Sequence, residues 1–108
     1  MDAYFTALDS DDFDHLRPGL SEEVRFRSSA DEVSGLTGFR KYMQDDRMIS
    51  NSTHNVTRRI HSDGPVSVCE GEVSGDTPDG HIEGAFCDVF EFDSDTERIT
   101  SITVYTRL

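Results

Sequence analysis

The spacing of apolar residues changes near Thr53, and this change constrains the fold more than any other feature of the sequence. From there to the C-terminus, apolar side chains recur at every second position, for example in Val66-Ser-Val68 and in Ile102-Thr-Val104. Side chains of a β-strand alternate between the two faces of a sheet with this period. Asp63-Gly64 and the loop 75–80 have the composition of hairpin turns. The second half of the chain is therefore predicted to form an antiparallel meander.

The first half of the chain carries apolar residues at helical spacing. Helices are predicted at residues 2–9, 11–20 and 34–46, and a short alternating strand at residues 24–28. Pro18-Gly19 is expected to distort or end the second helix, because proline lacks the backbone N–H that a helix interior needs. Helices followed by a meander indicate an α+β fold, and a length of 108 residues indicates a single domain, residues 1–108.

An aspartate lies among phenylalanines in the segment His81–Phe92, which is predicted to be the penultimate strand of the meander. Asp88 shares a face of this strand with Phe86, Phe90 and Phe92. Burying a charged carboxylate is costly, so we expect Asp88 to be partnered, protonated or facing a wet cavity. The alternative is an edge strand on which Asp88 simply reaches solvent.

Acidic residues dominate the charge of the chain, with 22 Asp and Glu against 10 Lys and Arg and a formal net charge of -12. Nucleic acids and anionic membranes are therefore not expected as partners, because both favour a basic surface. Lys41 is the only lysine. An acidic, lysine-poor surface resembles that of proteins from halophiles that accumulate salt, and an ordinary acidic cytosolic domain is the alternative.

The sequence carries no apolar run of membrane-spanning length and no signal peptide, which predicts a cytoplasmic protein. Cys69 and Cys87 are too few and too widely separated for a metal or redox motif, and whether they form a disulfide stays open. His54 and His61 are an odd number of residues apart, which places them on opposite faces of a strand. Neither a metal nor another cofactor is expected.

Several segments carry a family resemblance, namely Tyr4–Asp12, Gly35–Met43, Phe86–Phe92 and Ser101–Tyr105. In this order they resemble the opening helix, the third helix and the last hairpin of the nuclear-transport-factor-2-like superfamily. The chain is similar to its SnoaL-like and ketosteroid-isomerase-related branch. The resemblance implies a cone-shaped, curved, mostly antiparallel sheet wrapped around three N-terminal helices, a cystatin-like α+β roll. It also implies a pocket inside the cone and often a homodimer.

The resemblance also implies roles for particular residues. In the isomerase branch, a tyrosine of the first helix and an aspartic acid of the penultimate strand hold a developing oxyanion, and Tyr4 and Asp88 match these positions. Surrounding phenylalanines would desolvate the acid, raise its pKa and let it donate a hydrogen bond. Ser28 stands where that branch has its proton-abstracting aspartate, and serine is no base without an activating neighbour. Steroid isomerase activity is therefore not expected.

Two residues are candidates for the missing base. His54, expected to share a face with Val56, Arg58 and Ile60, has a side chain suited to proton transfer, and a structural histidine is the alternative. Glu70 lies on a strand face that is either the cavity side or a solvated edge. The candidate catalytic residues are Tyr4, Asp88 and His54, and the expected pocket lining is Phe26, Ser28, Met43, Phe86, Phe90 and Ile102.

Two classes of function stay open at this point. The chain either binds a modest apolar ligand with a carbonyl or hydroxyl, as an isomerase, cyclase or hydratase, or it is a non-catalytic dimerisation or interaction module whose cone is filled. An open cavity of a few hundred Å³ would favour ligand binding, whereas a cone packed shut would favour the interaction module. A homodimer is expected through the outer face of the sheet, where Val89, Ile99 and Tyr105 would form an apolar patch.

The charge of the chain predicts that its stability depends on salt. Surplus carboxylates repel one another at low ionic strength, and salt screens this repulsion over a Debye length of about 3 Å at 1 M. The melting temperature should therefore rise from low salt to molar KCl. A flat or falling curve in differential scanning calorimetry would rule out the halophilic interpretation.

Overall fold

A computed structural model describes residues 2–62 and 64–108 of the chain. The helices are α1 (Asp2–Ser10), α2 (Phe13–Leu16) and α3 (Leu36–Lys41), with a 3-10 turn (Arg17–Gly19) after α2 and a π-helical turn (Tyr42–Asp46) after α3. The strands are β1 (Leu20–Arg27), β2 (Glu32–Ser34), β3 (Ser50–His61), β4 (Val66–Thr77), β5 (Gly80–Phe92) and β6 (Ile99–Arg107).

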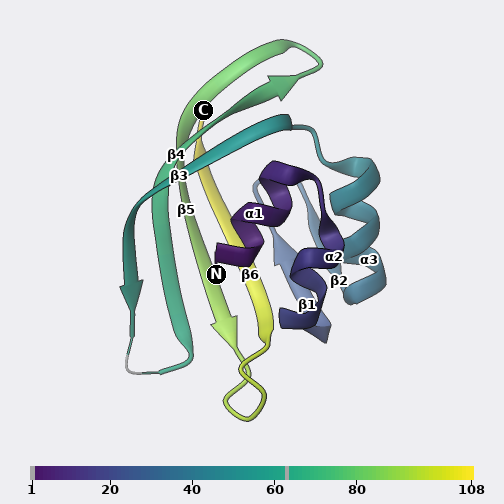
Figure 1. The fold of residues 1–108 in the computed structure, drawn as a ribbon, viewed down its shortest axis with the longest axis vertical. Coiled ribbons are helices and arrows are strands. Elements are labelled where there is room, and N and C mark those ends of the chain that lie inside the picture. Colours follow the sequence, from purple (N-terminus) through teal and green to yellow (C-terminus); the bar gives the residue numbers. More distant parts are fainter. Residues whose placement is uncertain (1, 63) are drawn as a thin grey trace.

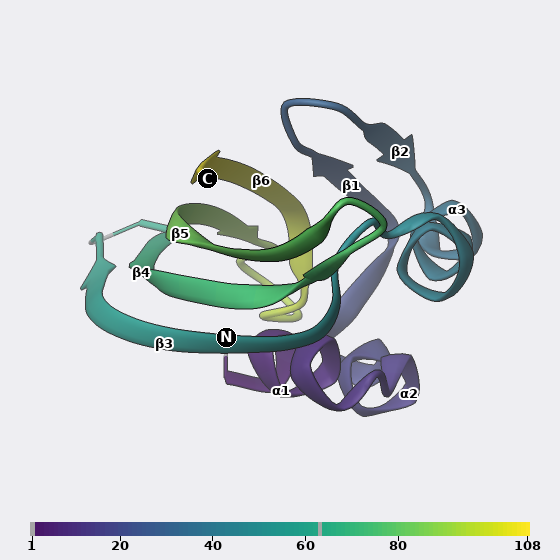
Figure 2. The same cartoon turned by 90° about the horizontal axis from the view of Figure 1, so that it is seen from above.

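The strands form a six-stranded sheet in the order β2-β1-β6-β5-β4-β3. β1 and β6 run parallel, and the other neighbouring pairs are antiparallel. Figure 1 shows that β3 to β6 are long and curved, with α1 on their concave side, and Figure 2 shows that the sheet stays open. The expected α+β fold, a curved and mostly antiparallel sheet around N-terminal helices, is confirmed.

Some local features differ from the sequence expectations. The polar loop after β1 contains the short edge strand β2, which pairs with β1 between Arg25 and Arg27. The second helix is shorter than expected, and Leu20 already begins β1, because Pro18 cannot donate the next helical hydrogen bond. The hairpin turn expected at Asp63-Gly64 lies partly outside the described residues.

α1 packs its apolar stripe into the concave side of the sheet. Phe5 and Leu8 are buried, as their helical spacing predicts, and the Phe5 ring centroid lies 5.3 Å from that of Phe86 on β5. At the β1 end of the same face, α3 stacks Phe39 on Phe26 of β1, with centroids 5.2 Å apart. Full burial of each such side chain contributes roughly 1.5–3 kcal/mol. These contacts hold the helices against the sheet and define the interior.

β3 changes face partway along its length because of a β-bulge. Val56 pairs with Gly71 of β4, whereas Arg58 pairs with the adjacent Glu70, so β3 contains one extra residue. His54 and Val56 before the bulge face the concave side, whereas Arg58 and Ile60 after it are exposed on the outer side. The expectation that Arg58 and Ile60 share a face with the start of the strand is therefore wrong, because strict alternation does not reveal a bulge.

A second β-bulge, at the start of β6, places the side chain of Ile99 in the core. Phe92 pairs with Ile99, whereas Glu91 pairs with Ser101, so the alternation is interrupted at the start of β6. Ile99 is buried, and the expectation that it points to the outer face is wrong. Tyr105, further along β6, is 60% exposed.

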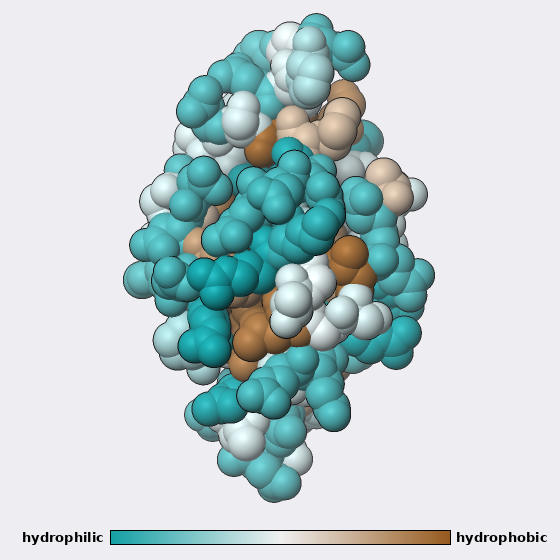
Figure 3. Space-filling model, turned by 90° about the vertical axis from the view of Figure 1, so that its right-hand side faces the viewer, coloured by the Kyte–Doolittle hydropathy of each residue, from teal (hydrophilic) through white to brown (hydrophobic). Residues whose placement is uncertain are grey.

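The surface is mostly hydrophilic on the face shown in Figure 3, and its hydrophobic areas there are small. Large apolar side chains that are exposed include Met48, Ile60, Tyr105 and Leu108. Within residues 2–62 and 64–108, no helix has the length and apolar character needed to cross a membrane.

The bulge in β3 predicts a strict requirement for glycine at position 71. A Cβ atom there would lie 2.0 Å from the backbone oxygen of Asn55, which is far inside contact distance. Gly71→Ala should therefore lower the free energy of unfolding by roughly 1–3 kcal/mol, the usual cost of overpacking. Urea unfolding followed by circular dichroism measures this change.

Gly38→Ala in α3 is the matched control. A Cβ atom at Gly38 has open space around it, and alanine is favoured over glycine in helices by about 1 kcal/mol. This variant should be as stable as the wild type or more stable. A Gly71→Ala protein of unchanged stability would show that β3 and β4 do not approach as described.

Candidate functional site

A cavity of about 330 Å³ lies between the concave face of the sheet, α1 and the segment that follows α3; we call it the cone cavity. Much of its wall is apolar and includes Leu8, Phe26, Met43, Val73, Phe86 and Val104. Polar side chains also line it, including those of Tyr4, Ser28, Asp31, Tyr42, Arg47, His54, Asp79 and Asp88. The cavity is thus an apolar space with polar groups at selected positions, as in sites for small molecules.

The residues singled out in the sequence fall into two groups. Those that line the cone cavity are Tyr4, Phe26, Ser28, Met43, His54, Phe86 and Asp88. Phe90 and Ile102 are instead fully buried in the hydrophobic core. Residues at alternate positions of a strand share a face whether a cavity or another side chain covers them. For this reason the sequence pattern does not separate pocket lining from core.

Asp88 projects from β5 into the cone cavity and is 2% exposed. Its Oδ1 atom is buried and has no hydrogen-bond partner among the described residues. Desolvation raises the pKa of Asp88 to about 7, because surroundings of low dielectric constant disfavour the charged carboxylate. Below this pH, Asp88 is mainly a neutral acid whose O–H is able to donate a hydrogen bond.

Tyr4 reaches the same cavity from α1 and is buried. Its ring packs edge-on against Phe90, with centroids 5.3 Å apart. Burial raises the pKa of Tyr4 well above its usual value, the charge of Asp88 raises it further, and Arg47 opposes the rise. The Tyr4 hydroxyl therefore keeps its proton at all ordinary pH values. Tyr4 and Asp88 are two protonated oxygens that face one apolar cavity.

His54 pairs with a carboxylate that the sequence pattern did not reveal. Its Nδ1 atom lies 2.6 Å from Oδ1 of Asp9 on α1, and its backbone N–H donates to Oδ2 of Asp9 at 2.8 Å. The hydroxyl of Ser52 donates to Oδ1 of Asp9 at 2.9 Å. Burial lowers the pKa of His54, and the hydrogen bond to Asp9 opposes this change. The imidazole is thus held in a fixed orientation at the edge of the cone cavity.

Arg47 brings a positive charge to the cone cavity and was also missed in the sequence. Its guanidinium donates to the backbone oxygen of Leu8 at 3.1 Å and to the Ser52 hydroxyl at 2.9 Å. These bonds fix the arginine between α1 and β3. An arginine in an irregular segment after a helix belongs to no periodic pattern, so only the fold reveals its position.

Ser28, at the position of the expected base, takes part in a turn. Its backbone N–H donates to the carbonyl of Asp31 at 2.8 Å, and its hydroxyl accepts from the N–H of Asp31 at 3.2 Å. Asp31 also lines the cone cavity. Burial raises the pKa of the neighbouring Tyr42, and Asp31 raises it further. The Ser28 side chain therefore supports the connection between β1 and β2.

Glu70, the other candidate for a base, lies on the outer face of the sheet. Its carboxylate is 3.6 Å from the guanidinium of Arg58, beyond the bulge of β3. The face of β4 that carries Cys69 and Val73 is the buried one, which settles the orientation that the sequence left open. Glu70 therefore does not reach the cone cavity.

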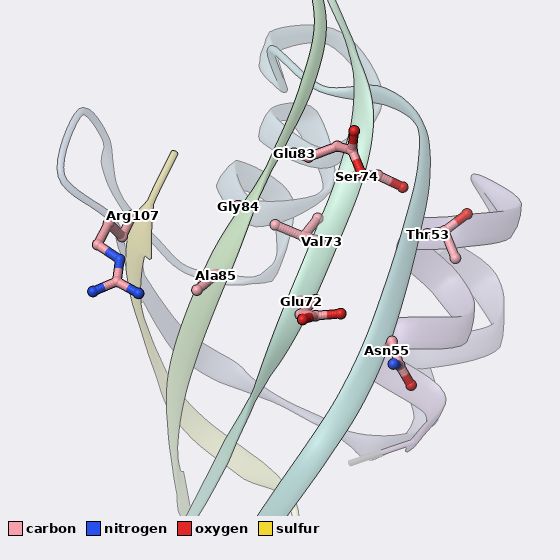
Figure 4. A pocket seen from close by; sticks show the side chains of 9 residues that line it. All are labelled: Thr53, Asn55, Glu72, Val73, Ser74, Glu83, Gly84, Ala85 and Arg107. Carbon is pink, nitrogen blue, oxygen red and sulfur yellow. The ribbon is translucent and has the colours of Figure 1, made fainter.

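The outer face of the sheet has a hollow of its own, of about 520 Å³, shown in Figure 4. Its side chains come from β3, β4, β5 and the end of β6, and those of Thr53, Asn55, Glu72, Glu83 and Arg107 are exposed. Water screens the charges of solvent-exposed polar groups, so their electrostatic interactions are weaker than those of buried groups. The cone cavity is therefore the better candidate for a chemical site.

The cysteines do not form a disulfide. Cys69 pairs in register with Asp88, and Cys87 pairs with Glu70, so the two thiols lie on opposite faces of the sheet. Across residues 2–62 and 64–108, no group of three or more His, Cys, Asp and Glu side chains is placed to hold a metal ion.

Solved structures share this fold over nearly the whole chain. An LEH-like epoxide hydrolase from M. tuberculosis has a TM-score of 0.80 at 20% identity, covering 98% of this chain and 78% of the other. An NTF2-like protein of unknown function from Exiguobacterium sp. 255-15 has a TM-score of 0.81 at 19% identity, covering 98% and 96%. A candidate polyketide cyclase from Xanthomonas campestris pv. campestris has a TM-score of 0.81 at 20% identity, covering 96% and 84%. At these identities the likeness shows the fold alone, which is NTF2-like.

The profile of the SnoaL-like domain family matches residues 1–102. The chain belongs to this family. The family resemblance indicated by the segments Tyr4–Asp12, Gly35–Met43 and Phe86–Phe92 is thereby confirmed. No curated protein matches the chain.

Burial of Asp88 predicts that stability falls as pH rises. The pKa of about 7 in the folded protein is above the unfolded value of ~3.9, so the folded state binds more protons between these values. The free energy of unfolding should therefore decrease from about pH 4 to pH 7 and level off above it, by roughly 4 kcal/mol in total. Asp88→Asn removes this titration.

Urea unfolding of both proteins across this pH range isolates the contribution of Asp88, because the other surface carboxylates are common to both. The stability of Asp88→Asn relative to the wild type should increase with pH. A difference that stays constant from pH 4 to pH 8 would contradict a buried, protonated Asp88.

Proposed function

We propose that this protein binds a small, largely apolar molecule in the cone cavity and polarises a carbonyl or hydroxyl oxygen of that molecule with Asp88 and Tyr4. The reaction class that fits such a site is an isomerisation, a cyclisation or a hydration. The ligand enters an interior whose volume of about 330 Å³ is at the lower end of the range for small-molecule sites. A modest ligand is therefore favoured over a large one.

The observation that carries this proposal is the unpartnered Oδ1 atom of Asp88. A buried polar atom without a hydrogen bond costs roughly 1–3 kcal/mol, and Oδ1 has no partner among the described residues. Asp88 also lines the cone cavity. A ligand oxygen that accepts the proton of Asp88 would satisfy this group, which gives the cavity a preference for ligands with an acceptor at that position.

The chemistry follows from the protonation of the two donors. A neutral acid and a phenol donate hydrogen bonds to a carbonyl oxygen, and these bonds strengthen when negative charge develops on that oxygen. The surrounding apolar wall excludes water and strengthens the effect. Two of the similar structures are an LEH-like epoxide hydrolase and a candidate polyketide cyclase, which is in keeping with catalysis on this fold.

A non-catalytic homodimer is the second candidate function. Tyr105 is 60% exposed and Ile60 is 43% exposed, and both lie on the outer face of the sheet with Val89. A second copy of the chain would cover these side chains. The burial of Ile99 reduces the expected apolar patch, and the open cone cavity does not match a filled cone.

A pair of matched ligands tests the proposal. β-Tetralone carries a carbonyl, and tetralin has the same rings without it. β-Tetralone should bind to the wild type more tightly than tetralin. Asp88→Asn should retain most of this binding because an amide also donates, whereas Asp88→Leu should weaken it by roughly 1–3 kcal/mol. Isothermal titration calorimetry measures these differences.

Tetralin binding is the internal control. Tetralin has no oxygen to accept a hydrogen bond from Asp88, so neither Asp88 variant removes a hydrogen bond to it. Equal affinity of the wild type for both ligands would sink the proposed role of Asp88. A chain that binds neither ligand and dimerises in light scattering would favour the second candidate function.

A further inference from the structure

We infer that His54, oriented by Asp9, is the base that removes a proton from the carbon next to the bound carbonyl and exchanges this proton with solvent. The inference rests on the proposed function, because it needs a carbonyl ligand held by Asp88 and Tyr4. It adds a general base to that site and assigns a role to Asp9.

The contacts around Asp9 fix the orientation of the imidazole. Asp9 accepts hydrogen bonds from the Ser52 hydroxyl at 2.9 Å and from the backbone N–H of His54 at 2.8 Å. The ring nitrogen Nδ1 of His54 lies 2.6 Å from the same carboxylate. A carboxylate only accepts hydrogen bonds, so Nδ1 carries the proton and Nε2 keeps its lone pair. Asp9 is thus a positioning residue for a neutral imidazole.

His54 lies in the wall between two spaces. On one side it lines the cone cavity together with Asp88 and Tyr4. On the other side it lines a hollow of about 570 Å³ between α1 and β3, together with Asp9 and Arg59; we call it the α1–β3 hollow. The side chain of His54 is only 8% exposed, whereas that of Asp9 is 28% exposed. Asp9 therefore holds the imidazole from the more exposed side, which leaves Nε2 for the cone cavity.

Other groups that line the cavity include the carboxylates of Asp31 and Asp79, and His54 is distinguished from them by the hydrogen bond with Asp9 that orients its ring. Ser28 is engaged in its turn with Asp31, and Asp88 serves as a protonated donor. The charged or titratable groups that face His54 are Asp9 and Tyr4 from α1, Arg47 from the segment after α3, Asp88 from β5 and Arg59 from β3. Burial lowers the pKa of His54, opposed by Asp9, which keeps the imidazole neutral near pH 7.

The proton transfer balances without an oxidant or a reductant. Nε2 of His54 takes a proton from the carbon next to the carbonyl, and the electrons of that C–H bond form a carbon–carbon double bond. The carbonyl oxygen becomes an enolate oxygen that accepts hydrogen bonds from Asp88 and Tyr4. The imidazolium returns the proton from Nε2 to the same carbon or to another carbon of the enolate, or gives it to water that enters the cone cavity.

Hydrogen exchange of β-tetralone in D2O tests the inference. Proton NMR follows the loss of signal from the carbons next to the carbonyl, corrected for exchange in buffer alone. The wild type should accelerate the exchange, and His54→Asn should lower the enzyme-catalysed rate by about 100-fold or more, the usual contribution of a general base. Asparagine still offers a donor to Asp9, so this variant preserves the contact with α1.

His61→Ala is the matched control. His61 lies at the far end of β3, is exposed and contacts Ser67 at 2.8 Å. Its replacement should leave the exchange rate unchanged. Melting temperatures of all variants, and the affinity for β-tetralone, are measured in the same samples.

The pH profile separates positioning by Asp9 from a merely structural role. The wild-type rate should rise through the pKa of His54 and fall as Asp88 loses its proton near pH 7. Asp9→Asn removes the charge that favours the imidazolium, so the rising limb should move to lower pH and the maximum should fall. Asp88→Asn should abolish the falling limb, because an amide does not titrate. An Asp9→Asn profile with an unmoved rising limb would overturn the assignment of Asp9.

The remaining outcomes distinguish this inference from the proposed function. β-Tetralone that binds without exchange, or an exchange rate unchanged in His54→Asn, overturns the role of His54 and leaves the binding site intact. Absence of β-tetralone binding overturns both. Nitrogen-15 NMR of the wild-type imidazole provides a test that needs no variant: a proton on Nε2 instead of Nδ1 would contradict the inference.

Discussion

Phe5 connects the elements that enclose the interior of this protein. Its ring centroid lies 5.3 Å from that of Phe86 on β5 and 5.4 Å from that of His54 on β3. Aromatic pairs at such distances contribute about 0.5–1.5 kcal/mol beyond the burial of their area. α1 has only nine residues, so this anchor determines how the whole helix lies on the sheet. It thereby places Tyr4 on the cone cavity and Asp9 beside β3.

Two aspartates near this anchor show how the environment decides the role of a side chain. Asp9 accepts hydrogen bonds from Ser52 and from the backbone of His54, which suit a charged carboxylate. Oδ1 of Asp88 has no partner in the described part of the chain, and desolvation raises the pKa of Asp88. Hydrogen-bond donors favour the charged form of a carboxyl group, and desolvation favours the neutral form. One site therefore holds an acceptor and a donor of the same residue type.

Much of the fold was predictable because it depends on local spacing. The change of period near Thr53 located the strands, and the stripe of Phe5 and Leu8 located α1. The two errors about which face a strand residue occupies have a common physical cause. Bulges in β3 and at the start of β6 each insert one residue, and a single insertion moves every later side chain to the other face. Ile60 and Ile99 were misplaced for this reason.

The sequence by itself determined that Asp88 shares a strand face with phenylalanines, and so that its carboxyl group would be desolvated if that face were covered. Only the tertiary structure decided that Asp88 lines a cavity and that Asp9 meets His54, 45 residues away in the chain. A periodic pattern reports which side chains share a face, because it reflects the geometry of one strand or helix. The contact between α1 and β3 instead depends on how these elements pack, and packing depends on the shape of all the side chains between them.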